Sequence, residues 1–399
     1  MVKEDDKLSR VGHYGSQSSS QSSSQSDDQS NNQSNSSNSC NNLSNNQSNT
    51  TNNSEANLEN KVSAGAKTSP YTEQAALLQR KNKRQSLCRT WILVLIALSS
   101  IITYLCWGGI PKNSFVFNMR WHSVVAIILT GAAIGASSMV FQAIVNNRII
   151  TPSILGLDSL YVLIQTCIVF VAGAEKLTDM NQTVLFLISL AVMLVFSFLL
   201  FKIMLRRSNH NVFFILLLSI VFGTLFSSFN TFMGTLLDPG EFLAVQSIGY
   251  ASFQAINTQV LTVSAIFLGV TFVLIWRCSK YLDVIALGKD TAVNLGIDYY
   301  RLTWRLLFLV VICVAVSTAL VGPVTFLGLL VMNLILQYIP SFRYRLLIPA
   351  CIFLSIAVLV LGQILVQRLF SFTTTISIII NFLGGCYFIF LLIRQQRKW

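Results

Sequence analysis

From residue 91 onward, long apolar runs alternate with short polar interruptions. A helix needs roughly 20 apolar residues to cross a hydrocarbon core about 30 Å thick. Ten runs reach or approach this length, so the sequence predicts an all-α polytopic membrane protein with about ten transmembrane helices. The runs are 91–108, 122–144, 154–173, 183–205, 212–236, 257–276, 302–321, 324–339, 346–367 and 374–393. The eighth run is short and follows Gly322-Pro323 almost directly, so its boundaries are the least defined.

The composition supports this assignment. Hydrophobic residues make up 53% of the chain and charged residues 11%, whereas a soluble domain carries about 25% charged residues. The formal net charge of +12 therefore does not indicate a nucleic-acid partner. In a membrane protein the informative property is where the positive charges fall between the spans.

The N-terminal part has a different composition. Residues 17–54 are almost entirely Ser, Asn and Gln. Such a segment cannot bury enough apolar surface to offset its chain entropy, so it is predicted to be disordered. We expect a cytoplasmic tail over residues 1–86 and a transmembrane domain over residues 87–399.

The positive-inside rule sets the expected orientation. With both termini in the cytoplasm, 19 of the 23 Lys and Arg residues from position 80 onward fall inside, and an odd number of spans would spoil this separation. The four that fall outside are Lys112, Arg120, Lys176 and Arg368. The prediction is ten spans with cytoplasmic N- and C-termini.

The longest polar-rich interruption among the spans is Tyr281–Arg305. Gly288 and Gly296 bracket about two turns, with Asp290 where a helix favours a capping or first-turn acid and Gly296 where it favours a stop. The apolar residues of this segment are Ala292, Val293 and Leu295. A short capped helix between basic flanks predicts a surface for another protein, and a plain connecting loop is the alternative.

Several chemistries are missing from the sequence. Asp158 and Lys202 are the charged residues nearest to a span centre, and both lie toward helix ends. Ion-coupled carriers keep buried ionisable groups on their pathway, so the energy for transport is expected to come from elsewhere. Gly288-Lys289 does not complete a phosphate-binding loop, because Asp283 stands where its first glycine would be. With dispersed histidines and no HExxH or GxSxG motif, we expect no catalytic residues, no metal site and no cofactor.

The spans carry small and uncharged polar residues instead. Gly131, Ala132 and Gly135, with their small neighbours up to Ser138, predict a close-packed face on the second span. The fifth span has polar residues that recur at helical spacing between Ser219 and Thr231. This face is equally consistent with a water-filled path for a polar cargo and with packing between helices.

Five stretches of the chain, taken in order, resemble the FecCD-type permease subunits of ABC importers for iron–siderophore complexes and cobalamin. They are Arg120–Ser138, Asn146–Tyr161, Ala286–Gly296, Val321–Val331 and Asn381–Arg394. NRIITPSILGLDSLY within the second stretch, with DPGEFLAVQ at Asp238–Gln246, is most similar to the branch for catecholate siderophores such as anguibactin or petrobactin. The resemblance covers most of residues 91–399. It implies the type II ABC importer permease fold in a bacterial plasma membrane, with ATP hydrolysis by a partner subunit.

The resemblance also implies roles for particular residues. The polar interruption is similar to the coupling helix that docks on a cytoplasmic ATPase dimer, and its residues are Leu287, Gly288, Asp290, Ala292, Val293, Leu295 and Gly296. Arg120 and Arg368 match arginines that engage an extracellular siderophore-binding lipoprotein, with membrane-interface anchors as the alternative. The residues expected to line the translocation pathway for the ferric siderophore are Ser227, Ser228, Asn230 and Thr231.

The chain departs from the family pattern at several positions. His122 and Ser123 replace a proline and a second arginine, Met332-Asn333 replaces Pro-His, and a proline is missing near Thr375–Ser377. These changes suggest one half of a heterodimer whose second permease subunit supplies the missing features. Cobalamin or haem as cargo, and a secondary transporter working alone, are the alternative functions.

Overall fold

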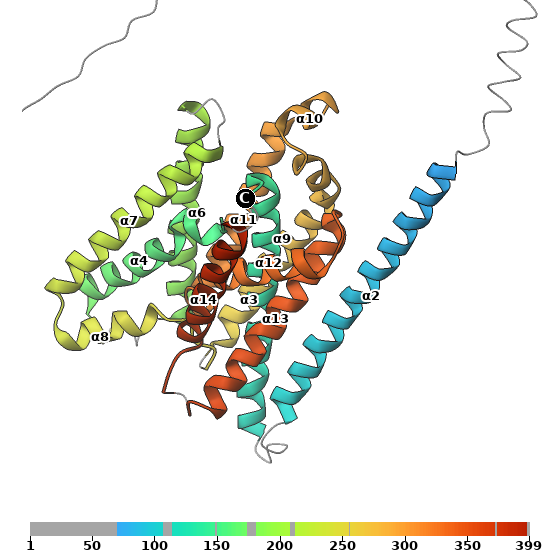
Figure 1. Ribbon diagram of the computed structural model, residues 1–399. Coiled ribbons are helices and arrows are strands. Elements are labelled where there is room, and N and C mark those ends of the chain that lie inside the picture. Colours follow the sequence, from blue (N-terminus) through green and yellow to red (C-terminus); the bar gives the residue numbers. More distant parts are fainter. Residues whose placement is uncertain are drawn as a thin grey trace, which may run out of the picture. The chain divides into compact units, whose positions relative to one another are not determined.

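A computed structural model of the chain describes residues 70–106, 114–147, 150–173, 181–207, 212–254, 256–371 and 373–396. These residues form helices and short connections, and no β-strand occurs among them (Figure 1). The helices are α2 (Pro70–Cys106), α3 (Ser114–Val145), the 3₁₀ helix η1 (Pro152–Leu155), α4 (Leu157–Ala172), α6 (Gln182–Arg207), α7 (Val212–Leu236), α8 (Pro239–Ile248), α9 (Thr258–Ile285), α10 (Lys289–Asn294), α11 (Tyr299–Val321), α12 (Leu327–Tyr338), α13 (Tyr344–Arg368) and α14 (Ile376–Gln396).

Each of the ten predicted spans coincides with a helix. Seven of these helices are long and apolar enough to cross a membrane, and α4, α12 and the apolar part of α14 are shorter. The 12 residues of α12 rise only about 18 Å, which agrees with the weak boundaries expected for the eighth span. The prediction of an all-α polytopic membrane protein is confirmed, whereas the side on which the termini lie stays a prediction.

Helix α3 lies at the centre of the bundle and contacts α9, α11, α12 and α13. The predicted close packing is confirmed, because a Cβ added to Gly135 would lie 2.7 Å from Ser355 Oγ and 2.9 Å from the Cys351 carbonyl oxygen of α13. The expectation of a single packed face is too narrow. Every residue from Thr130 to Val145 is buried, because neighbouring helices surround this part of α3 on all sides.

Two helices extend beyond the spans expected from hydropathy. Helix α9 continues to Ile285 rather than ending at residue 276, because the polar segment after Trp276 still consists of residues that a helix accepts on its aqueous side. Helix α2 begins at Pro70, so the expected boundary between residues 86 and 87 falls inside it. The rest of the expected tail, together with Lys112 and Lys176, lies outside the described residues, and the two-domain division stays a prediction.

The third predicted span is broken at its start. The chain forms η1, passes through Gly156 with φ +76°, and only then begins α4 at Leu157. A Cβ on Gly156 would lie 2.9 Å from the Cα of Gly223, which is at the middle of α7. Two glycines in contact therefore place the beginning of α4 at mid-length of a neighbouring apolar helix.

Candidate functional site

The polar interruption does contain a short helix, α10, and its ends are built by the two glycines. Gly288 caps the N-terminus with φ +103°, and Gly296 follows the C-terminus with φ +76°. The N–H of Gly296 donates to the Val293 carbonyl at 2.9 Å, and the N–H of Ile297 donates to the Ala292 carbonyl at 3.1 Å. This pair of bonds is the Schellman arrangement, in which a left-handed glycine ends a helix.

The apolar residues of this segment divide into two groups. Leu287, Val293 and Leu295 are 65%, 50% and 62% exposed. Ala292 is fully buried, so it does not belong to the exposed group, and its predicted role in the coupling helix stays a prediction. A six-residue helix can bury only one narrow side, and here that side faces α9 and α11. The result is a compact apolar surface on a polar connection.

Several contacts hold α10 on the helices beside it. The ammonium group of Lys289 lies 5.1 Å from the centroid of the Tyr300 ring at the start of α11. A hydrogen bond with Tyr300 raises the pKa of Lys289 above its ordinary value, so the contact favours the charged form of this side chain. On the other side, the Tyr344 N–H of α13 donates to Asp283 Oδ1 of α9 at 2.7 Å. The end of α9 that leads into α10 is thereby joined to a second span.

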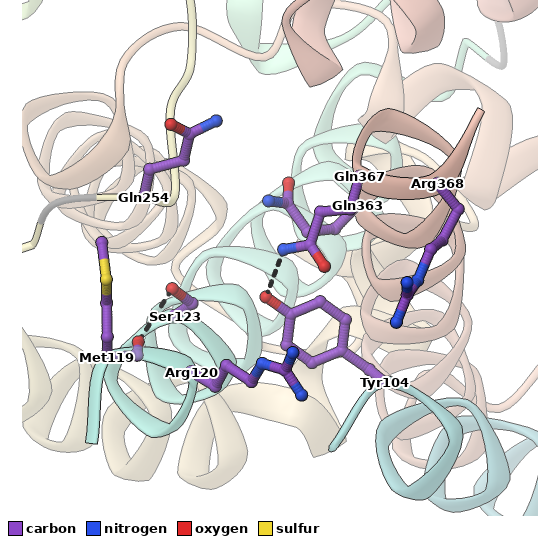
Figure 2. Close-up of a pocket in the computed structure, with 8 residues that line it drawn as sticks. All are labelled: Tyr104, Met119, Arg120, Ser123, Gln254, Gln363, Gln367 and Arg368. Carbon is purple, nitrogen blue, oxygen red and sulfur yellow. Dashed lines mark hydrogen bonds between the residues drawn. The ribbon is translucent and has the colours of Figure 1, made fainter. Parts of the chain in front are cut away.

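Arg120 and Arg368 line the same cavity of about 390 Å³, although they come from α3 and α13. Figure 2 shows both side chains extending toward Tyr104 of α2, whose hydroxyl accepts a hydrogen bond of 2.8 Å from Gln367 Nε2. Arg120 Nη1 is buried and has no hydrogen-bond partner among the described residues. In Figure 1, this end of α3 and α13 lies opposite the end that carries α10.

The surroundings of Ser123 bear on one departure from the family pattern, the absence of a second arginine after Arg120. Ser123 is buried at the wall of the same cavity, and its hydroxyl donates to the Phe253 carbonyl oxygen at 2.6 Å, so its polar group is used inside the protein rather than offered to a partner. Sequence reasoning missed Tyr104, Gln363 and Gln367 as cavity residues. The spacing of the two glutamines was an available signal, because residues four apart in a helix share a face.

The four pathway residues lie on α7, a helix that is exposed along most of its length. Ser227 and Asn230 line a cavity of about 240 Å³, while Asn230 and Thr231 line an adjacent cavity of about 700 Å³ beside α8. Ser228 is exposed, and its hydroxyl donates to the Thr224 carbonyl at 2.9 Å. The structure thus brings three of the four residues to the two cavities, and each of the four roles remains a prediction.

The smaller cavity also contains groups that sequence reasoning did not assign. Asp158 of α4, Thr325 before α12, and Ser377 and Asn381 of α14 line it. Ser377 lies in the segment where the family proline is missing. Its hydroxyl accepts from the Ala251 N–H at 2.8 Å and donates to the Pro323 carbonyl at 3.1 Å, so it joins the connection after α8 to the connection before α12. Asp158 and Asn381 are more than 200 positions apart in the chain, so only the tertiary fold reveals the cluster.

Comparisons with known proteins give relatives of this chain by sequence and by fold. Residues 88–394 match the FecCD transport family. The chain is 51% identical over 280 residues to the petrobactin import system permease protein YclO of Bacillus subtilis strain 168, covering 70% of this chain and 89% of that protein. It is 33% identical over 346 residues to the petrobactin import system permease protein FatC of Bacillus anthracis, covering 84% and 98%. A solved metal-chelate-type ABC transporter in an inward-facing conformation has a similar fold, with a TM-score of 0.68 at 19% identity over 77% of this chain and 99% of that one.

Proposed function

Because this chain belongs to the FecCD transport family, we propose that it is the membrane permease subunit of a bacterial ABC importer for iron(III)–siderophore complexes. The two relatives at 51% and 33% identity are named as petrobactin import permeases, which favours a ferric siderophore over cobalamin or haem. A separate cytoplasmic ATPase dimer supplies the energy. The chain is then a permease without enzymatic activity of its own, rather than a secondary transporter.

The observation that carries this proposal is helix α10 with its exposed leucines. Leu287 and Leu295 are more than 60% exposed, and they flank a helix that is too short to cross a membrane. Apolar side chains with this exposure on a polar connection are suited to the hydrophobic centre of a protein interface. We assign them to a cleft of the ATPase, in which α10 acts as the coupling helix.

The contacts around α10 give the coupling a mechanical route. Movement of α10 is transmitted to α9 and α11, which it joins, and to α13 through the bond between Asp283 and Tyr344. Helix α13 packs along α3, where Gly135 allows the two backbones to approach closely. Closure of the ATPase dimer would thus reach the central helix of the bundle through a few rigid elements.

The opposite end of the bundle is suited to a substrate-binding protein outside the cell. Arg120 and Arg368 place two positive groups at one cavity, and Arg120 Nη1, which has no partner in the described part of the chain, leaves a donor for an acidic residue of a docking protein. Charge pairing of this kind mainly increases the rate and specificity of encounter. Under this proposal α10 and both chain termini lie in the cytoplasm, and we assign the docking partner as an extracellular siderophore-binding lipoprotein.

The exposed polar face of α7 supports a pathway at a dimer interface. Ser227, Ser228 and Thr231 are exposed in the single chain, and hydroxyl groups facing lipid would gain nothing from that position. A second permease subunit packed against α7 would enclose them together with the two neighbouring cavities. Because buried Ser123 offers no charge where the family has an arginine, we assign the second subunit to a different chain, which makes a heterodimer.

Uptake of iron carried by a catecholate siderophore tests the function. Cells that lack this chain should lose uptake, the wild-type chain should restore it, and Leu295→Asp should reach the membrane without restoring it. The matched control is Asn294→Asp, which adds the same charge at the adjacent exposed position without removing apolar surface. Unchanged uptake after deletion would refute the siderophore assignment. Full activity of Leu295→Asp would refute the coupling role of α10.

A further inference from the structure

The 240 Å³ cavity beside α7 holds a carboxylate among otherwise neutral polar groups. Its wall is formed by residues from α4, α7, the connection after α8, the connection before α12, and α14. The polar side chains that matter here are Asp158, Ser227, Asn230, Thr325, Ser377 and Asn381. Asp158 is the only charged residue among those that line the cavity.

Four of the five neutral groups already have partners within the protein: Asn230, Thr325, Ser377 and Asn381. Thr325 Oγ1 donates to Asn381 Oδ1 at 3.1 Å, and Asn230 Oδ1 accepts from the Thr166 hydroxyl. Asp158 is less well satisfied: Oδ1 accepts from Thr318 Oγ1 at 3.1 Å, while buried Oδ2 has no hydrogen-bond partner among the described residues. A single hydrogen bond from a neutral hydroxyl stabilises a buried carboxylate only weakly.

The position of Asp158 makes this deficit significant. Gly156, two residues earlier, contacts Gly223 at the middle of α7, so the carboxylate lies at mid-length of an apolar helix rather than at an aqueous surface. Asp158 does occupy the first turn of α4, where the helix dipole favours an acid. That stabilisation is smaller than the desolvation penalty of a carboxylate, so the dipole alone does not account for an acid at this place. An ionisable residue inside the membrane is by default a functional site.

We propose that Asp158 makes this cavity a binding site for a cationic group of the cargo, of the protonated-amine class, during its passage. The site rests on the proposed function, because it places Asp158 beside the pathway residues Ser227 and Asn230. A volume of about 240 Å³ accepts an alkylammonium arm but not a whole ferric chelate. A bare divalent ion is a poorer candidate, because no cluster of three His, Cys, Asp or Glu residues occurs in the described part of the chain. Asp158 is thus a specificity-determining residue.

The first test compares two ferric catecholate complexes that differ in one arm, which ends in a primary ammonium group or in its neutral acetamide. Asp158→Asn keeps the shape of the side chain and removes the charge. It should reduce uptake of the ammonium complex by about tenfold and leave the acetamide complex within about twofold of wild type. The matched control is Asp238→Asn, the same change at an exposed residue before α8. Equal losses for both complexes, or no loss for the ammonium complex, would overturn the inference.

A second measurement separates this site from the import function. Methylammonium chloride should raise the thermal unfolding temperature of purified wild-type protein more than potassium chloride does at equal ionic strength. Asp158→Asn should remove that difference, and Asp238→Asn should retain it. If wild type imports neither complex but this difference depends on Asp158, then the import function fails and the cation site stands. If methylammonium stabilises both proteins equally, the cation site is refuted whatever the uptake result.

Discussion

Asp283 at the end of α9 accepts a hydrogen bond of 2.7 Å from the backbone N–H of Tyr344, the first residue of α13. The residue before Tyr344, Arg343, occupies the N-cap position without a side-chain bond. Asp283 therefore provides, from another helix, an acceptor for one of the N–H groups at the start of α13 that have no partner within the helix. The same contact joins the segment leading into α10 to the helix that packs along α3.

The first prediction concerns this contact. Asp283→Ala removes the acceptor and should lower the free energy of unfolding by about 1–2 kcal/mol. It should also weaken the stimulation of ATPase activity by cargo-loaded binding protein, because α9 and α13 would no longer move together. Asp283→Asn keeps an acceptor oxygen and should remain close to wild type in both measurements. A loss of stability with unchanged stimulation would show that the bond stabilises the fold without transmitting movement.

Helix α10 illustrates what local sequence determines. Gly288 and Gly296 have the two positive φ angles that end the helix, and these glycines alone predicted its position to within one residue. The burial of Ala292 could not be predicted, because it depends on where α9 and α11 pass beneath the helix. Local capping is readable from the sequence, whereas the exposed face of a six-residue helix is set by its tertiary neighbours.

The second prediction concerns Gly296, the glycine that follows the end of α10. Gly296 has φ +76° with open space around its Cβ position, so Gly296→Ala should lower the free energy of unfolding by about 1 kcal/mol through backbone strain alone. Gly385 in α14 also has open space but lies within a helix, and Gly385→Ala should raise stability by roughly 0.5–1 kcal/mol. Thermal unfolding of the two variants in detergent measures whether each substitution lowers or raises the stability. A neutral or stabilised Gly296→Ala protein would contradict the left-handed cap.

The Asp158 cavity illustrates what the sequence leaves hidden. Hydropathy placed Asp158 near the end of a span, and it does lie in the first turn of α4. The preceding break at Gly156 moves that helix end to the middle of α7, so an end position in sequence becomes an interior position in space. Asn381 and Thr325 join the cavity through long-range packing that has no periodic signal. The existence of the spans was predictable because it follows from the length of each apolar run. The depth of Asp158 within the bundle was not predictable, because it depends on how the helices pack.

The third prediction concerns Arg120 and Arg368, the two arginines of the 390 Å³ cavity. Arg368→Gln and Arg120→Gln should each slow association of the siderophore-binding protein with the permease in lipid nanodiscs by about tenfold at low salt. Raising the salt from 0.1 M to 1 M shortens the screening length from about 10 Å to about 3 Å, and it should reduce the wild-type rate toward that of the variants. Lys280→Gln, an exposed change at the α10 end of the bundle, is the control. Unchanged rates in both arginine variants would favour the membrane-anchor role.

The last prediction separates a pathway from simple packing on α7. Ser227→Leu adds bulk at the wall of the 240 Å³ cavity and should reduce ferric siderophore uptake by about tenfold or more, while basal ATPase activity of the assembled transporter is retained. Val221→Leu adds a single methylene on the same helix at a residue that is 55% exposed, and it should leave uptake unchanged. If Ser227 served only to pack α7 against another subunit, the leucine would disrupt assembly, and ATPase activity and uptake would fall together. Retained ATPase activity with lost uptake therefore identifies a blocked pathway.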